Sequence, residues 1–252
     1  MKKIIIDPKF EFLRKYISDI PNTFDSNGSV LENKRNVIRE TEVHGLKLVI
    51  KSFRRIYLPN RIRYSFFYPS KAQRAFDYAK ILLKKGIRTP QPIGYIEVKR
   101  YGLIHESFFI SDSIDFTPLQ VGREEKPVMT PEFMIELARF TYKLHQSNIY
   151  HVDYSLGNIL FKKIDGAWQF ALVDNNRMTF GPVSFHKGIR ALVKLTLPVE
   201  FLTWIGKEYA RLRKVNEIIA VAALFQYKRR HMLNRQMKGS MKGIVAHLKS
   251  IW

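Results

Sequence analysis

Short apolar runs separated by polar loops mark the first 110 residues as a region of strands. Five such runs are present, at 29–31, 37–43, 46–53, 92–98 and 103–110. Turn residues stand between consecutive runs at His44–Gly45 and near Arg100–Gly102, which predicts two hairpins. The expected result is a small antiparallel sheet.

One helix is predicted beside this sheet. Apolar residues recur at helical spacing between an N-cap at Ser70 and a stop signal at Gly86, which predicts a helix over 70–85. Residues 1–25 have a mixed composition that ends in a turn at Pro21, so they are expected to form a weakly structured lead-in.

The second half of the chain is predicted to be mainly helical. Thr130 and Pro131 introduce a helix with one apolar face, and the pattern after Arg177 is again helical. The exception is a hairpin of strands 159–164 and 167–173, turned at Asp165–Gly166, a pair that accepts the positive φ values of a tight turn. The fold class is therefore α+β, with two parts at 1–110 and 111–252, divided where Ser111, Asp112 and Ser113 interrupt the strand pattern.

Polar residues gather at the open end of the second hairpin. Asn158 enters it, Asp174 leaves it, and His151 and Asp153 lie a few residues upstream. Individually these signals are ordinary, because an isolated His-x-Asp is common and Asp-Asn-Asn often forms a solvated turn. Together, His-x-Asp-x-x-x-x-Asn, a hairpin and then Asp follow the order used by kinase-type phosphotransferases.

That order assigns a role to each residue. Asp153 would take the proton of the acceptor hydroxyl, while Asn158 and Asp174 would hold the Mg²⁺ that bridges nucleotide phosphates. An amide and a carboxylate supply the oxygen ligands that Mg²⁺ requires. His151 is counted with the catalytic residues.

Nucleotide-binding residues are predicted in the first part. Lys51 lies inside an apolar strand, where a lysine often points to solvent, but the downstream motif favours contact with the α and β phosphates. No Gly-x-Gly-x-x-Gly loop is present, so Lys34 and Arg35 are expected to contact the phosphates together with backbone N–H groups. Ile110, at the end of the last strand, is also predicted to bind the nucleotide.

A partner for Lys51 is predicted on the helix. Asp77 is the sole acidic residue from Ser52 to Ile96, and kinases hold their phosphate-binding lysine with a helix carboxylate. The sequence therefore predicts an ion pair between Lys51 and Asp77 in the active conformation. The alternative is a solvated helix Asp with a weak surface interaction.

The net charge of the chain indicates which classes of partner it can bind. The 252 residues carry a net charge of +21, which favours polyanions such as nucleic acid, an anionic membrane face or a phosphorylated glycolipid. Seven basic residues and no acid occur from Lys51 to Arg74, interleaved with aromatic residues. That mixture suits a membrane interface or single-stranded nucleic acid, the plainer alternative being a solvated loop whose aromatic residues fold into a core.

Compartment is predicted from absences in the sequence. The chain has no cysteine, its N-terminal apolar run is too short for a signal peptide, and no stretch approaches the ~20 apolar residues of a membrane span. A cytoplasmic location is expected.

With Lys51, Asp77, His151, Asp153, Asn158 and Asp174 in chain order, the sequence resembles the lipopolysaccharide-core kinases, the Kdo and heptose kinase family, especially its InaA-like branch. The matching stretches are Arg-Asn-Val-Ile (35–38), Leu-Val-Ile-Lys-Ser-Phe (48–53), Ser-Lys-Ala-Gln-Arg-Ala-Phe-Asp-Tyr-Ala-Lys (70–80), Arg-Phe-Thr-Tyr-Lys-Leu-His (139–145), Gly-Asn-Ile-Leu (157–160) and Leu-Val-Asp-Asn-Asn-Arg-Met (172–178).

The resemblance implies a two-lobed protein-kinase-like fold, with a small antiparallel-sheet N-lobe, one flanking helix and a mainly helical C-lobe. It implies ATP- and Mg²⁺-dependent phosphorylation of a Kdo or heptose sugar of the lipopolysaccharide inner core. The expected substrate is an anionic glycolipid of the Kdo-lipid A type, reached by peripheral contact with the inner membrane. No nucleic-acid partner is expected.

The sequence departs from the usual kinase pattern in three places, and two other functions are possible from the sequence. The helix acid is Asp instead of Glu, Asp174 lacks a following Phe-Gly, and no Ala-Pro-Glu segment occurs. The last two departures argue against a regulated protein kinase. A phosphotransferase for aminoglycosides or choline is a second enzyme hypothesis. A pseudokinase scaffold is the non-enzyme hypothesis, favoured by the missing glycine loop and opposed by the intact Asp153, Asn158 and Asp174.

Overall fold

The computed structural model describes residues 1–54, 56–119 and 129–250, and only the backbone of 238–250. Arg55, one of the seven basic residues from Lys51 to Arg74, lies outside the described residues. The chain forms two compact units, Met1–Thr117 with Ala171–Met178, and Pro118–Phe170 with Thr179–Trp252. The predicted parts, 1–110 and 111–252, place the division a few residues earlier and leave 171–178 in the second part.

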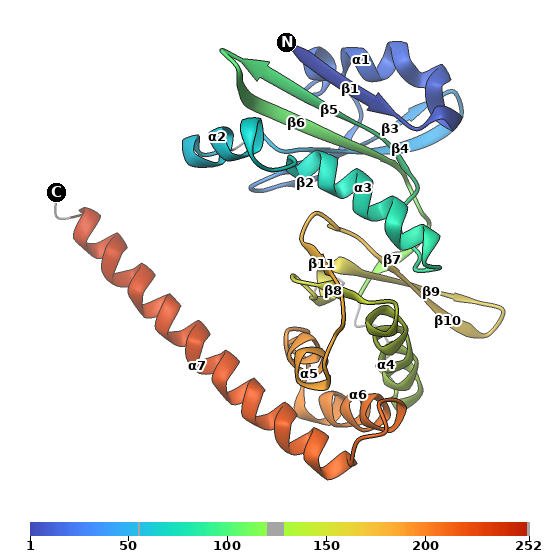
Figure 1. Cartoon of the computed structure of the whole chain (residues 1–252), viewed down its shortest axis with the longest axis vertical. Coiled ribbons are helices and arrows are strands. Elements are labelled where there is room, and N and C mark those ends of the chain that lie inside the picture. Colours follow the sequence, from blue (N-terminus) through green and yellow to red (C-terminus); the bar gives the residue numbers. More distant parts are fainter. Residues whose placement is uncertain (55, 120–128, 251–252) are drawn as a thin grey trace. The chain divides into compact units, whose positions relative to one another are not determined.

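The first unit is built on one antiparallel sheet with the strand order β1-β5-β6-β4-β3-β2 (Figure 1). Its strands are β1 (Lys2–Ile6), β2 (Ser29–Asn33), β3 (Val37–Val43), β4 (Leu46–Ser52), β5 (Pro92–Arg100) and β6 (Leu103–Asp112). The predicted hairpins are confirmed, since β3 pairs with β4 and β5 with β6. The turn residues His44 and Gly45 have φ values of 52° and 75°, as a tight hairpin turn requires.

The prediction of a weakly structured lead-in is wrong. β1 adds an edge strand by pairing with β5, and the 3-10 helix η1 (Pro8–Leu13) and α1 (Arg14–Thr23) cover one sheet face. The residues that form this core are Ile6, Leu13, Ile17, Ile20, Phe24, Leu48, Ile50, Ile93, Ile96, Phe108 and Ile110. Burying one such side chain contributes about 1.5–3 kcal/mol, which fixes the segment despite Pro21 inside α1.

The opposite sheet face packs against α3 (Lys71–Lys84), as Figure 1 shows. The helix and its cap are confirmed, because the Ser70 side chain accepts the N–H of Gln73. Phe53, Ala72, Phe76 and Tyr95 form a second core on this side. A further helix in this unit, α2 (Leu58–Phe66), was not predicted.

The second unit is mainly helical, as predicted. Its helices are α4 (Pro131–Gln146), α5 (Phe185–Val193), α6 (Val199–Leu212) and α7 (Glu217–Ser250). Its shorter elements are β8 (Ile149–His151), the 3-10 helix η2 (Leu156–Asn158), β9 (Ile159–Ile164), β10 (Ala167–Leu172) and β11 (Met178–Phe180), while β7 (Thr117–Pro118) joins β9 and β10 in a three-stranded sheet. The turn at Asp165–Gly166 is confirmed, with φ values of 49° and 79°.

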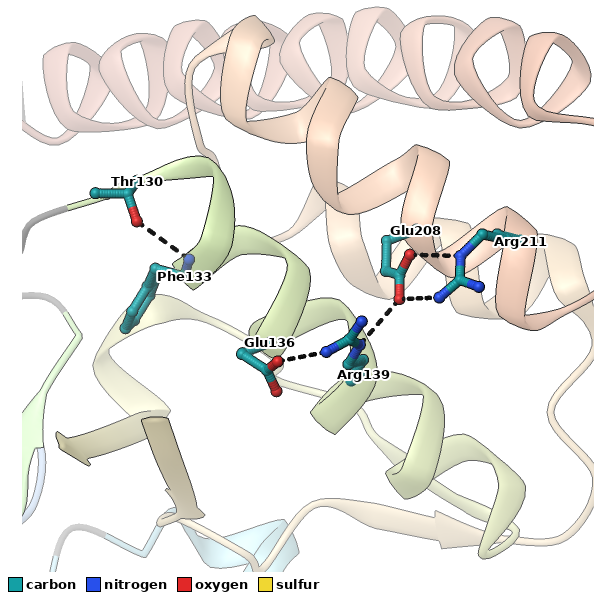
Figure 2. Close-up of polar contacts among 6 residues, drawn as sticks. All are labelled: Thr130, Phe133, Glu136, Arg139, Glu208 and Arg211. Carbon is teal, nitrogen blue, oxygen red and sulfur yellow. Dashed lines mark hydrogen bonds and ion pairs between the residues drawn. The ribbon is translucent and has the colours of Figure 1, made fainter. Parts of the chain in front are cut away.

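Helix α4 is anchored in this unit by polar contacts (Figure 2). The Thr130 hydroxyl accepts the N–H of Phe133, which confirms the predicted helix start. Further along, Arg139 donates through Nε to Oε1 of Glu208 on α6 over 3.0 Å. Arg211 donates to both oxygens of the same carboxylate, over 2.7 and 2.8 Å. The contact between Arg139 and Glu208 links α4 to α6, and Arg211 holds the Glu208 carboxylate from within α6.

No helix in the described part of the chain is both long and apolar enough to cross a membrane.

Candidate active site

Lys51 and Asp174 form the centre of a charged cluster in the first unit. Side chains alternate along β4, so Leu48 and Ile50 enter the core under α1 while Lys51 projects to the α3 face. There Lys51 Nζ lies 2.6 Å from Oδ1 of Asp174. The two side chains are 14% and 31% exposed, so a ligand can reach them.

The segment that carries Asp174 is fastened to the first unit on both sides. Before it, the Leu172 carbonyl accepts the Thr89 hydroxyl over 2.7 Å, and that hydroxyl in turn accepts the Asn175 amide. After it, the Asn176 carbonyl accepts Nε of the buried Arg74 over 3.0 Å. Asp174 itself has a φ of 58°, a left-handed conformation that Asp tolerates better than most residues. Local contacts therefore fix the Asp174 carboxylate.

Positive charge exceeds negative charge around this carboxylate. Lys71, the first residue of α3, and Lys51 both place Nζ over the Phe53 ring, at 5.8 and 5.7 Å from its centroid. Burial lowers the pKa of Lys71, and the neighbouring Arg35 and Arg74 lower it further. Several cations thus share one nearby carboxylate, an arrangement that favours an anionic ligand such as a polyphosphate.

The predicted ion pair between Lys51 and Asp77 is replaced by the pair between Lys51 and Asp174. Helix α3 crosses β5 and β6, and Asp77 lies on its side towards β1, where its charged neighbours are Lys3 and Lys80. Burial raises the pKa of Asp77, with a hydrogen bond to Gln73 opposing the shift. Lys51 lies on β4, three places from β1 in the sheet, so the helix carboxylate and the strand lysine face different strands.

Of the other residues predicted to bind the nucleotide, two are exposed and one is buried. Arg35 is exposed and close enough to influence Lys71. Lys34 is exposed beside Glu32, with 3.6 Å between Nζ and Oε1. The side chain of Ile110 is fully buried in the core under α1, on the face opposite Lys51, so it is not available to a ligand.

The second unit holds the loop from His151 to Asn158. His151 is fully buried, and its Nδ1 accepts the N–H of Asp153 over 3.2 Å. His151 therefore positions the loop, and its full burial does not fit its place among the predicted catalytic residues. Asn158 donates its amide to the Asp153 carbonyl over 2.8 Å, which leaves the amide oxygen as its metal-binding atom.

Residues outside the predicted set support this loop from two helices. Thr141 on α4 hydrogen-bonds the hydroxyl of the fully buried Tyr154 over 2.7 Å. Lys194, which follows α5, donates to the Val152 carbonyl over 2.7 Å and to the Tyr150 hydroxyl over 3.0 Å. Burial raises the pKa of Tyr154, so this hydroxyl stays neutral. Spacing along the sequence gave no signal for Lys194, because its role depends on where α5 ends.

Neither unit by itself supplies a complete set of ligands for a hard cation among its described residues. Oδ1 of Asp174 accepts hydrogen bonds from Lys51 and Asn176. Among the described residues, no group of three or more His, Cys, Asp or Glu side chains could hold a metal alone. An amide oxygen, one carboxylate oxygen and ligand phosphates are the donor set that Mg²⁺ accepts in kinases. Asp174 belongs to the first unit and Asn158 to the second.

A strand lysine, a buried His two residues before an Asp, an Asn five residues later and a post-hairpin Asp define the protein-kinase-like class. A family model described as the lipopolysaccharide kinase (Kdo/WaaP) family matches residues 32–180, more than half of the chain. The chain belongs to this family. Comparison with curated protein sequences gave no match.

Two solved structures have the same fold. "WaaP in complex with acyl carrier protein" is 16% identical with a TM-score of 0.61, over 90% of this chain and 98% of that chain. The "microcompartment-associated aminopropanol kinase" is 10% identical with a TM-score of 0.56, over 84% and 86%. Family membership makes this protein a phosphotransferase that acts on a sugar hydroxyl of the lipopolysaccharide core, and the class uses ATP.

Proposed function

We propose that the protein is an ATP- and Mg²⁺-dependent kinase that phosphorylates a Kdo or heptose sugar of the lipopolysaccharide inner core. We place its action at the cytosolic face of the inner membrane, on an anionic glycolipid of the Kdo-lipid A type. The observation that carries the proposal is the charged cluster of Lys51, Lys71 and Asp174, in a chain whose family acts on lipopolysaccharide.

In the proposed reaction, the acceptor hydroxyl gives its proton to the Asp153 carboxylate. The hydroxyl oxygen bonds to the γ-phosphorus, the bond from that phosphorus to the bridging oxygen of ADP breaks, and ADP leaves with the electron pair. Lys51, Lys71 and Arg35 bind the phosphate oxygens. Asn158 and Asp174 would hold Mg²⁺, which neutralises charge on the phosphates when bound.

The experiment combines the full-length protein, ATP, Mg²⁺ and Kdo-bearing lipid A, followed by mass analysis of the lipid. We expect a mass increase of one phosphate, and Asp153→Asn should reduce kcat by ~10² to 10⁴ while ATP affinity stays within about twofold. An Asp153→Asn variant with more than about a tenth of the wild-type kcat would remove Asp153 from the base role.

A second set of reactions distinguishes the alternatives. Aminoglycosides, choline and short amino alcohols replace the lipid, because the aminopropanol kinase shares the fold. Phosphorylation of these small alcohols alone would make this chain a small-molecule kinase. ATP binding without transfer to any acceptor would support the pseudokinase scaffold. WaaP was solved with an acyl carrier protein, so that protein is tested as a partner by adding it to each reaction.

A further inference from the structure

Helix α2 faces the rest of the first unit with its polar side. The Ser65 hydroxyl accepts the N–H of Ile104, the second residue of β6, over 2.7 Å. Arg61 donates to the Ile56 carbonyl over 2.9 Å, and the half-buried Tyr64 lies under the guanidinium of Arg74, 5.3 Å from its ring centroid. Hydrogen bonds and a cation–π contact therefore attach α2 to the unit.

The apolar side of α2 faces solvent. Leu58, Ile62 and Phe66 recur every four residues, so they share one helix face, and they are 60%, 43% and 65% exposed. No residue of α2 is buried. Tyr57 and Phe67, at the two ends of the helix, are 71% and 79% exposed. This orientation is opposite to that of an ordinary surface helix, which buries its apolar stripe.

The grouping of these residues separates them from ordinary exposed apolar side chains. Phe12 on η1 is 59% exposed, and Tyr101 stands at a hairpin turn. Neither belongs to a row of exposed apolar side chains on one face of an element. A contiguous exposed apolar face marks an interaction surface, whereas isolated residues need no explanation.

Charge and side-chain type indicate what binds the apolar face of α2. The chain has no acidic residue from Phe53 to Phe76, and Arg63, beside the apolar face, holds its guanidinium 4.7 Å from the Tyr68 ring centroid. Cations bordering an apolar face complement a bilayer with anionic headgroups. Single-stranded nucleic acid needs aromatic rings for base stacking, and the middle of this face is aliphatic.

We propose that α2 docks the first unit on an anionic phospholipid bilayer. Leu58, Ile62 and Phe66 enter the boundary of the acyl chains, and Arg63 remains among the headgroups. The inference goes beyond the proposed function, because docking requires neither ATP nor a sugar acceptor.

The absence of cysteine from the sequence gives a direct test. Phe66→Cys and Phe12→Cys, each in the full-length protein, carry an environment-sensitive fluorophore on a single thiol. Phe12 is the matched control, since both positions are exposed phenylalanines of the first unit. With phosphatidylglycerol-containing vesicles we expect a blue shift and a several-fold rise in emission at position 66, little change at position 12, and little change at either with phosphatidylcholine alone.

A second measurement removes the apolar face without a label. The triple variant L58S/I62S/F66S should lose at least tenfold in cosedimentation with the anionic vesicles, while Phe12→Ser binds as wild type does. Circular dichroism confirms that each variant folds, and if the triple variant does not, the labelled pair decides.

Equal responses at positions 66 and 12, or none at 66, would overturn the proposal. A response at 66 to purified acyl carrier protein or to oligonucleotide, without one to vesicles, would also overturn it and assign the face to that partner. Because vesicle binding is measured without ATP, it can fail while the kinase activity stands, and the reverse.

Discussion

Asp174 in the first unit and Glu208 in the second are both held by basic side chains, but they are held differently. Glu208 is almost fully buried at 9% side-chain exposure, and both of its oxygens accept hydrogen bonds from Arg139 and Arg211. Asp174 keeps 31% exposure, and its hydrogen bonds from Lys51 and Asn176 both go to the same oxygen, Oδ1.

The charged side chains around the two carboxylates also differ. The arginine side chains around Glu208 are 50% and 59% exposed, so water screens their charge, and the Arg211 hydrogen bond is the main reason that the pKa of Glu208 is lowered. Around Asp174, the cations Lys51, Lys71 and Arg74 are all at least partly buried, so water screens their charge less. A nearly buried carboxylate with both oxygens hydrogen-bonded serves the fold, whereas a partly exposed one beside surplus cations is poised for a ligand.

The sharpest test of this comparison exchanges each carboxylate for its amide. Asp174→Asn should lower kcat/KM by ~10² to 10³, because a neutral amide is a poorer metal ligand and a weaker partner for Lys51. ATP titrations with and without Mg²⁺ give a readout independent of turnover, and their difference should shrink in the variant. Asn tolerates the φ of 58° at this position, so the unfolding free energy should change little.

Glu208→Gln should give the opposite result. Loss of the charge weakens the contacts to Arg139 and Arg211, at a cost of about 1–2 kcal/mol in unfolding free energy. Urea unfolding measures this, and kcat of the folded fraction should be unchanged. If Glu208→Gln impaired turnover as strongly as Asp174→Asn, the distinction between the two carboxylates would fail.

Lys71 tests whether the surplus positive charge binds phosphate. Lys71→Met removes the charge and retains a side chain of similar length, and we expect KM for ATP to rise about tenfold, or ~1.4 kcal/mol. Arg211→Met is the matched control, since that charge is already committed to Glu208. An unchanged KM in Lys71→Met would mean that the cluster around Asp174 is structural.

The smallest expected effect concerns His145, where the second unit excludes charge. Burial lowers its pKa to about 3, and the charges of Arg213 and Lys187 contribute; its Nδ1 lies 2.9 Å from the Tyr209 hydroxyl. Below the unfolded pKa near 6.5, the unfolded chain binds a proton that the folded chain rejects, so stability falls as pH decreases from about 6.5 towards 3.

Between pH 7 and 5.5 this one group should cost about 1 kcal/mol. Unfolding curves of the wild type and His145→Gln at both pH values measure the difference. The variant should lose about 1 kcal/mol less than the wild type over that range. Parallel losses in the two proteins would show that His145 is not the titrating group.

Local sequence patterns correctly predicted features that depend on a few neighbouring residues. The caps at Ser70 and Thr130 and the turns at His44–Gly45 and Asp165–Gly166 were all predicted, because capping and turn geometry depend on neighbouring residues. The lead-in was misjudged although Leu13, Ile17, Ile20 and Phe24 follow a helical spacing of four, three and four residues. Burial of these side chains outweighs the helix-breaking tendency of Pro21.

The sequence by itself determined the elements and the class of chemistry, because periodicity, capping and motif order are properties of short stretches. Only the tertiary structure decided which carboxylate meets Lys51. That choice depends on the path of α3 across the sheet, which turns Asp77 towards β1, and on contacts of Thr89 and Arg74 that fix the Asp174 segment in the first unit. The outward apolar face of α2 was decided in the same way, because Ser65 is bonded to a strand that begins 38 residues further along the chain, at Leu103.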